Sequence, residues 1–135
     1  MAMSAEEKYQ YWLDAAQYDL KTAEAMLTTG RWLYVAFMCQ QAVEKLVKGL
    51  YVLYMDDNVP RTHNIRTIIR RYEKKLPVEI STETIKLFDE LSTCYLNNRY
   101  PEYKGQLSSM IKEPEANALY SQTHEAFTWL LTLKP

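Results

Sequence analysis

Apolar residues recur at spacings of three and four along most of this chain, a pattern typical of helices that bury one face. The clearest run lies between residues 32 and 54, where one seam contains Ala36, Cys39, Val43, Leu46, Leu50 and Leu53. A second run covers residues 5–28, with an apolar line of Trp12, Ala16, Leu20, Ala23 and Leu27. No segment alternates apolar and polar residues for long enough to predict a strand. The pattern therefore predicts an all-α fold.

Local signals mark the ends of the two long helices. Ser4 and Glu7 form a capping box at the start of the first helix, and Gly30 is a C-terminal stop. The second helix is expected over Trp32–Tyr54. At 1.5 Å per residue each helix is roughly 35 Å long, and the short turn between them predicts an antiparallel hairpin. Gly49 lies inside the second helix, where glycine costs about 1 kcal/mol relative to alanine, and a close approach of another helix would explain it.

Three shorter helices are expected in the second half of the chain. They are a short basic helix over residues 64–75, a medium one over residues 81–96 and a last one that starts with Pro114. Their inner positions are Ile65, Ile68, Ile69, Tyr72 and Leu76; Ile85, Phe88, Leu91 or Ser92, and Tyr95; and Ala116, Tyr120, Thr123, Phe127 and Leu130. Residues 97–112 are expected to form a loop, because Tyr100 precedes a proline. The pattern predicts one domain over residues 1–135, an antiparallel bundle of four to five helices, of which two are long, two medium and one short and basic.

Composition narrows the function classes. The chain has 135 residues with a net charge of -1, so no overall field draws it to nucleic acid or to a membrane. No apolar run approaches the ~20 residues that span a bilayer, and the N-terminus has no secretory apolar region. The chain is therefore expected to be cytoplasmic. Its two cysteines, Cys39 and Cys94, are expected to be buried, reduced thiols.

Metal and nucleophile motifs are missing from the sequence. The only histidines are His63 and His124, and neither follows a glutamate by three residues, as a di-metal bundle site requires. The chain has three glycines, too few for a glycine-rich phosphate loop, and it has no Gly-x-Ser-x-Gly motif. We expect no metal and no cofactor, and we expect a structural role for His124.

A basic segment is the first candidate for anion binding. It contains one acidic residue, Glu73, and six basic ones: Arg61, Arg66, Arg70, Arg71, Lys74 and Lys75. Such a segment can hold a phosphate or an RNA backbone, or it can be a solvated helix face. His63 lies near the start of this helix, where a neutral imidazole suits a general base but also suits a cap or a turn. The sequence leaves both pairs of alternatives open.

Two other groups of polar residues are candidates for a cleft. Arg99 lies beside a tyrosine and a proline, where it could clamp an anion or bind a neighbouring carboxylate. Gln41, Glu44, Lys45 and Lys48 are interleaved with the apolar seam of the second helix. They could line a cleft, or they could be the polar face of the helix, with Glu44 and Lys48 paired across one turn.

Four segments in this order resemble the HEPN domain family, the nucleotide-binding helical domains of higher eukaryotes and prokaryotes. They are Ala16-x-x-Asp19-Leu20, Phe37-x-Cys39-Gln40-Gln41-Ala42-Val43-Glu44-Lys45-x-x-Lys48, Thr62-His63 and Asn98-Arg99-Tyr100-Pro101. The resemblance extends from about Tyr11 to Leu131. It implies a prokaryotic bundle of four or five helices, often dimeric and often encoded beside a minimal nucleotidyltransferase. Members of the family are toxins of toxin–antitoxin pairs, ribonucleases, or non-catalytic domains that bind nucleotides or partners.

The chain departs from the signature of the family's ribonuclease branch. That branch carries an arginine, four to six residues, then a histidine, and its members cut RNA as dimers without metal. After Arg99, the positions for the histidine hold Lys104, Gly105 and Gln106, and Arg61 is only two residues before His63. Residues 117–119, the corresponding positions before His124, include no arginine. The resemblance therefore favours a protein that is not an enzyme of this kind.

We expect a HEPN-like domain that binds a nucleotide or an RNA phosphate, forms a homodimer and acts with a minimal nucleotidyltransferase in a toxin–antitoxin type module. The expected cleft residues are Lys48, His63 and Arg99, with Gln41, Glu44 and Lys45 beside them. One alternative is a metal-independent ribonuclease toxin that uses Arg99 and His63 as catalytic residues. The other is a dimeric interaction bundle without a ligand, since eleven tyrosines and three tryptophans can supply a partner interface.

Overall fold

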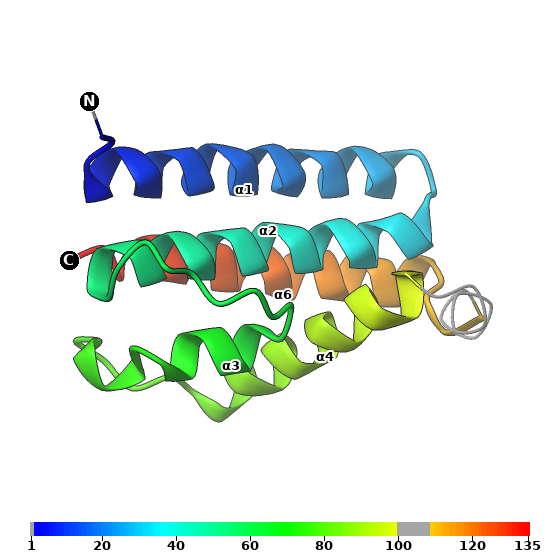
Figure 1. The fold of residues 1–135 in the computed structure, drawn as a ribbon. Helices are drawn as coiled ribbons and strands as arrows, with labels where there is room; N and C mark the ends of the chain where they lie inside the picture. The colour runs from blue at the N-terminus through cyan, green and yellow to red at the C-terminus, as the bar shows by residue number, and fades with distance from the viewer. Residues whose placement is uncertain (1, 100–108) are drawn as a thin grey trace.

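The computed structural model describes residues 2–99 and 109–135, without the side chains of residues 96–99. Every secondary-structure element in these two ranges is a helix: α1 (Ala5–Thr28), α2 (Trp32–Tyr54), α3 (Ile65–Arg70), the 3-10 helix η1 (Glu73–Lys75), α4 (Thr82–Arg99) and α6 (Glu113–Leu131). Figure 1 shows α1 and α2 side by side and antiparallel, with α6 and α4 on the other sides of α2. The expected all-α antiparallel bundle is confirmed.

The α1–α2 hairpin has the bounds that its local signals predict. Ser4 and Glu7 form both hydrogen bonds of the capping box, each 3.1 Å long. Gly30 ends the hairpin turn with a φ of 75°, a conformation that suits glycine. A Cβ atom at Gly49 would lie 2.9 Å from Cβ of Trp12. The glycine in α2 therefore allows the close approach to α1 that we expected.

α2 is the central helix of the bundle and packs against α1, α3, α4 and α6. Five of its six predicted seam residues have no exposed surface, which confirms the seam. Gln40, Glu44 and Lys48 are buried as well. Glu44 and Lys48 are paired across one turn, as the polar-face interpretation predicted. They do not form an exposed face, because neighbouring elements cover this side of the helix.

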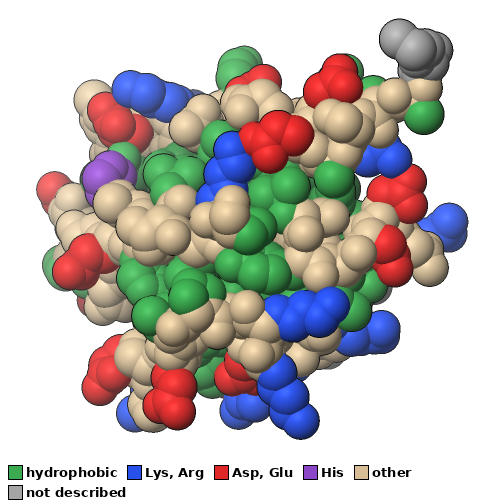
Figure 2. All heavy atoms as spheres, turned by 90° about the vertical axis from the view of Figure 1, so that its left-hand side faces the viewer, with side chains coloured by type: hydrophobic (Ala, Val, Ile, Leu, Met, Phe, Trp, Pro, Cys, Tyr) green, Lys and Arg blue, Asp and Glu red, His purple; other side chains and the backbone are tan. Residues whose placement is uncertain are grey.

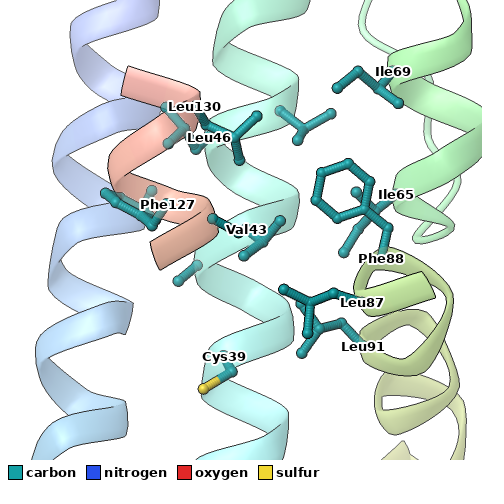
Figure 3. Packing of buried hydrophobic residues seen from close by; sticks show 14 of the residues in the cluster. Cys39, Val43, Leu46, Ile65, Ile69, Leu87, Phe88, Leu91, Phe127 and Leu130 are labelled. Atoms are coloured by element: carbon teal, nitrogen blue, oxygen red, sulfur yellow. The ribbon is translucent and has the colours of Figure 1, made fainter. Parts of the chain in front are cut away.

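Figure 3 shows how the apolar core lies on both sides of α2. Val43 and Leu46 lie between the side chains of α3 and α4 and those of α6. The core residues of α3 and α4 in this view are Ile65, Ile69, Leu87, Phe88 and Leu91, and those of α6 are Phe127 and Leu130. The predicted inner residues Phe88, Leu91, Phe127 and Leu130 are all buried. The periodicity therefore located the core correctly in both halves of the chain.

Two helices differ in length from the prediction. α3 ends at Arg70 instead of continuing to residue 75, because the next residues turn so that the Tyr72 hydroxyl donates to the Val47 carbonyl oxygen at 2.7 Å. α4 continues to Arg99, and Ser109 and Met110 are also helical, so the loop expected over residues 97–112 is wrong at these positions. Residues 100–108 lie outside the described part of the chain. Asparagine lowers helix stability only slightly, and the first strong stop signal is the proline at position 101.

The two cysteines, Cys39 and Cys94, are buried and unpaired, as predicted. Burial raises the pKa of the Cys39 thiol to about 12 and that of the Cys94 thiol to about 11. None of the helices in the described ranges has the length and apolar character needed to cross a membrane.

Candidate functional site

A buried carboxylate is the centre of the candidate site. Glu44 lies on α2 with its side chain 6% exposed. It accepts a hydrogen bond from Gln40 Nε2 at 2.6 Å, and it pairs with Lys48 Nζ at 2.9 Å. Both of its oxygens lie 3.1 Å from Nδ1 of His63. Because a buried charge needs such partners, these four residues form one connected structure, here named the Glu44 network.

The chain builds the Glu44 network from two segments. Gln40, Glu44 and Lys48 are spaced by four, which puts them on one face of α2. After α2, residues 55–64 run back across this helix, as Figure 1 shows, and so bring His63 beside a carboxylate 19 residues earlier. The end of this returning segment is held in place where α3 begins, because the amide of Ile65 donates to Ser92 Oγ of α4 at 3.1 Å.

The imidazole of His63 connects the buried network to solvent. Its side chain is 46% exposed, and its ring stacks on Tyr95 of α4 with the centroids 4.0 Å apart. Tyr95 in turn stacks on Phe37 of α2 at 6.0 Å. When Nδ1 of His63 carries a proton and donates it to Glu44, Nε2 is left as an acceptor. Within the described residues, no hydrogen bond uses that second nitrogen.

The remaining predicted site residues lie in different surroundings. Gln41 donates to Gln40 Oε1 at 2.6 Å and so borders the network. Lys45 pairs instead with Asp19 of α1 at 2.6 Å. The side chain of Lys48 is only 9% exposed and is paired with Glu44, so it holds the network in place. Arg99 ends α4, and its side chain lies outside the described part of the structure.

The structure thus brings Gln41, Glu44, Lys48 and His63 together and places Lys45 elsewhere. Whether they bind a ligand stays a prediction. Gln40 is part of the site although the sequence reasoning did not select it. Its spacing of four from Glu44 was the available signal. The stacking of His63 on an α4 tyrosine had no such local signal.

A cavity of about 650 Å³ lies beside the network, between α1, α2 and the returning segment. It is lined by Met3, Lys8, Tyr11, Trp12, Ala15, Lys45, Val52, Asp57, Asn58, Val59 and Arg61, and we name it the α1–α2 cavity. Lys48 lies between the two features, because its Nζ atom bonds Glu44 and is 6.0 Å from the centroid of the Trp12 ring. Figure 2 shows the end of the bundle where α1 begins and α2 ends, with apolar side chains at its centre and charged ones around them.

Comparisons with known proteins give one matching family model and two solved structures with a similar fold. The family model of the HEPN domain matches residues 9–133. The crystal structure of TT1696 from Thermus thermophilus has a TM-score of 0.79 at 20% identity, over 93% of this chain and 97% of that one. ST0689, an archaeal HEPN homologue, has a TM-score of 0.73 at 19% identity, over 95% of this chain and 98% of that one. At these identities the structural likeness concerns the fold. A comparison with curated proteins gave no match.

Proposed function

This chain belongs to the HEPN domain family, and from that premise we propose that it is a non-catalytic member that binds a nucleotide or an RNA phosphate at the exposed edge of His63. We further propose that it acts as a homodimer with a minimal nucleotidyltransferase, as one half of a cytoplasmic toxin–antitoxin type module. The partner and the module follow from the family resemblance, and the binding edge follows from the Glu44 network.

The burial of Glu44 and Lys48 is the observation that carries the proposal. A buried ion pair rarely stabilises a fold more than apolar side chains of the same size would. Here the pair also holds an imidazole, which stacks on Tyr95 and faces solvent on its other side. Binding sites are often built in this way, with the exposed group oriented by packed and hydrogen-bonded neighbours.

The proposed ligand contacts the ring of His63 directly. With Glu44 fixing the ring from inside, the neutral imidazole of His63 accepts at Nε2 from a ribose hydroxyl or a base N–H, and the doubly protonated ring donates from Nε2 to a phosphate oxygen. Arg99 follows Tyr95 by four residues in α4, a spacing that puts two positions on the same helix face. We therefore assign Arg99 the role of the cation that neutralises the ligand, since Lys48 is already paired. Gln41 donates to Gln40 of the network, whereas Lys45 pairs with Asp19 of α1.

Isothermal titration with nucleoside triphosphates tests the proposal. The wild-type protein is expected to release or absorb heat at millimolar ligand, and His63→Ala is expected to remove that signal. His124→Ala is the matched control, because this second histidine is exposed on α6 and contacts Tyr120. An absence of heat from the wild-type protein at millimolar nucleotide would rule out the nucleotide role.

A ribonuclease is the second candidate function, and one observation favours it. A histidine that a buried carboxylate orients through Nδ1 has the geometry of a general base. Incubation of the protein with RNA in EDTA separates the two candidates. Cleavage that disappears in His63→Ala would make the protein an enzyme, whereas intact RNA at a large excess of protein would exclude this activity.

Two further measurements test the proposed homodimer and its proposed partner. Light scattering of the purified chain is expected to give twice the monomer mass. A pull-down with the tagged chain is expected to recover a nucleotidyltransferase encoded beside it. A monomer at all concentrations tested would contradict the homodimer but would leave the binding proposal intact.

A further inference from the structure

Two neighbouring cavities lie between α4 and α6. They meet at Gln122 and have volumes of about 310 Å³ and about 510 Å³. Their described walls come from α4 between Glu83 and Cys94, from α6 between Glu115 and Trp129, and from residues 110–111. We name these walls together the α4–α6 groove. At 1.5 Å per residue its α6 side is roughly 21 Å long, so the groove is long enough for about four turns of a helix.

The floor of the groove is apolar. Leu87, Leu119 and Ala126 line it and are 6–8% exposed, so each keeps a small apolar surface open to the groove. Trp129 lines one end and is only partly buried, and Met110 lines the other end and is 67% exposed. Tryptophan and methionine are enriched in protein interfaces. The floor therefore suits a partner helix whose apolar side chains recur every three or four residues.

The rim of the groove is acidic on both sides. Glu83 and Glu90 lie on one face of α4, and Glu115 and Glu125 lie on α6. Glu115 accepts a hydrogen bond from the amide of Lys112. Among the residues that the structure describes, the other three glutamates have no ion pair, and no lysine or arginine lines either cavity. The whole chain has a net charge of only -1, so the acidic rim is a local feature that a cationic partner would complement.

We propose that the α4–α6 groove is the docking surface for a basic amphipathic helix of another protein, with its apolar side chains on the floor and arginine or lysine on both flanks. The stems of such cations cover apolar surface, and a cation can also lie over the ring of Trp129. The groove shares no residue with the Glu44 network. The inference therefore goes beyond the proposed function and can hold or fail without it.

A second copy of this chain does not supply such a helix from its described residues. α3 is only six residues long, less than half the length of the groove, and its Arg66 and Arg70 already pair with Asp89 and Glu73. The apolar faces of the longer helices are buried in the bundle's own core. The occupant that fits is thus a helix from a different protein.

A designed peptide tests the groove. It has about 15 residues, enough to match the α6 side, with leucine at every third or fourth position, arginine on both flanks and alanine elsewhere. A fluorescent label on the peptide is expected to show saturable binding to the unmodified protein as a rise in anisotropy. A peptide of the same composition in an order without an apolar face is expected to bind at least tenfold more weakly. Raised ionic strength is expected to weaken binding, because the rim carboxylates are exposed.

Two pairs of variants locate the peptide. Glu125→Lys is expected to weaken binding at least tenfold, and its matched control, Asp14→Lys on α1, less than twofold. Ala118→Trp fills the groove and is expected to weaken binding at least tenfold, whereas Ala25→Trp on α1 should leave it unchanged. All four positions are exposed, so the substitutions do not enter the core.

The tryptophan side chains give a second readout in the unmodified protein. Nitrogen–proton correlation spectra contain one indole signal for each of the three tryptophans, and Trp129→Phe identifies the signal of Trp129. The peptide is expected to shift this signal, because Trp129 lines the groove. The signal of Trp12 is expected to stay, because this ring lies on α1 beside Gly49.

Several results would overturn the inference. They are no saturable binding at millimolar peptide, equal affinity for the reordered peptide, equal affinity in Glu125→Lys, and an unchanged signal of Trp129. A Trp129 signal that shifts with protein concentration alone would make the groove an interface between copies of this chain. That result would also remove the proposed docking of a different protein.

Discussion

α2 and α3 both carry charged residues spaced by four, but the two helices use them in opposite ways. Glu44 and Lys48 of α2 are buried and joined into one network with His63. Arg66 and Arg70 of α3 are exposed, and each pairs with a single acidic residue at its own surface. The position of a helix within the bundle, and not its number of charges, therefore decides which charged residues form a connected site.

The basic segment illustrates the same difference. Its count of basic residues made it a candidate for RNA backbone binding. In the structure Arg66 pairs with Asp89 at 3.1 Å and Arg70 with Glu73 at 3.2 Å. Surface pairs of this kind contribute roughly 0–1 kcal/mol. Arg61, the first residue of the segment, instead lines the α1–α2 cavity. The comparison predicts large effects for substitutions in the network and small ones on α3.

The largest effect is expected for Glu44→Ala. This change leaves the ammonium group of Lys48 buried without its counter-ion, so the free energy of unfolding should fall by about 3–5 kcal/mol. Urea unfolding followed by circular dichroism measures it. Asp89→Ala, which removes the exposed partner of Arg66, should lose at most about 1 kcal/mol in the same assay. Equal losses in the two variants would contradict the difference between the helices.

A double variant separates stability from function in the network. Glu44→Leu/Lys48→Met replaces the buried pair by apolar side chains of similar size. Such replacements are often neutral or stabilising, so most of the stability lost in Glu44→Ala should return. Ligand binding at His63 should not return, because the imidazole has lost its carboxylate partner. Recovery of both properties would show that the network is only structural.

The second-largest loss of stability is expected for Gly49→Ala. The added Cβ atom would lie 2.9 Å from Cβ of Trp12, and neither atom can move without its backbone. Overpacking of this kind costs about 1–3 kcal/mol, against a gain of about 1 kcal/mol in helix propensity. Urea unfolding should therefore show a net loss of about 1 kcal/mol. An exposed control is Ser121→Ala on α6, where no such contact exists in the described structure and only the small propensity gain applies. A stabilised Gly49→Ala protein would exclude a tight α1–α2 contact.

The long helices were predictable from sequence because their ends depend on neighbouring residues. The capping box at Ser4 and the glycine at position 30 are local signals, and α1 and α2 have the predicted bounds. The length of α3 was not predictable, since it depends on the hydrogen bond between Tyr72 and Val47, which are 25 residues apart. The end of α4 was placed too early, because the proline at position 101 was taken to mark a loop that begins at residue 97, whereas the helix continues to Arg99.

The candidate site was predictable only in part, for the same reason. The spacing of four between Glu44 and Lys48 indicated their pairing. Their burial depends on four other elements around α2, and no pattern within the helix itself gives that information. The contact between Glu44 and His63 requires the chain after α2 to turn back across that helix. Periodicity and local motifs in a single sequence do not predict that the chain turns back across an earlier helix.

The third-largest loss of stability is expected just after α3, where Tyr72 is hydrogen-bonded to α2. Tyr72→Phe removes the hydroxyl that donates to the Val47 carbonyl oxygen, so about 1 kcal/mol of stability should be lost at neutral pH. Burial raises the pKa of Tyr72 well above its usual value. Above a pH of about 10 the unfolded chain therefore loses this proton while the folded chain keeps it. Stability should fall as pH rises through that range, and less steeply in Tyr72→Phe than in the wild type. Equal alkaline slopes in urea unfolding would contradict this account.

The smallest effect is expected for the surface pair itself, and it completes the comparison. A double-mutant cycle of Arg66→Ala and Asp89→Ala should give a coupling of about 0.2–1 kcal/mol, because both side chains are nearly half exposed. The coupling should decrease as salt is raised, since screening acts on exposed charges. The corresponding cycle of Glu44→Leu and Lys48→Met should give a larger coupling that salt changes little, because the buried pair is out of reach of counter-ions. If salt weakened both couplings equally, the Glu44 network would be accessible to water, and His63 would no longer be the only part of it open to a ligand.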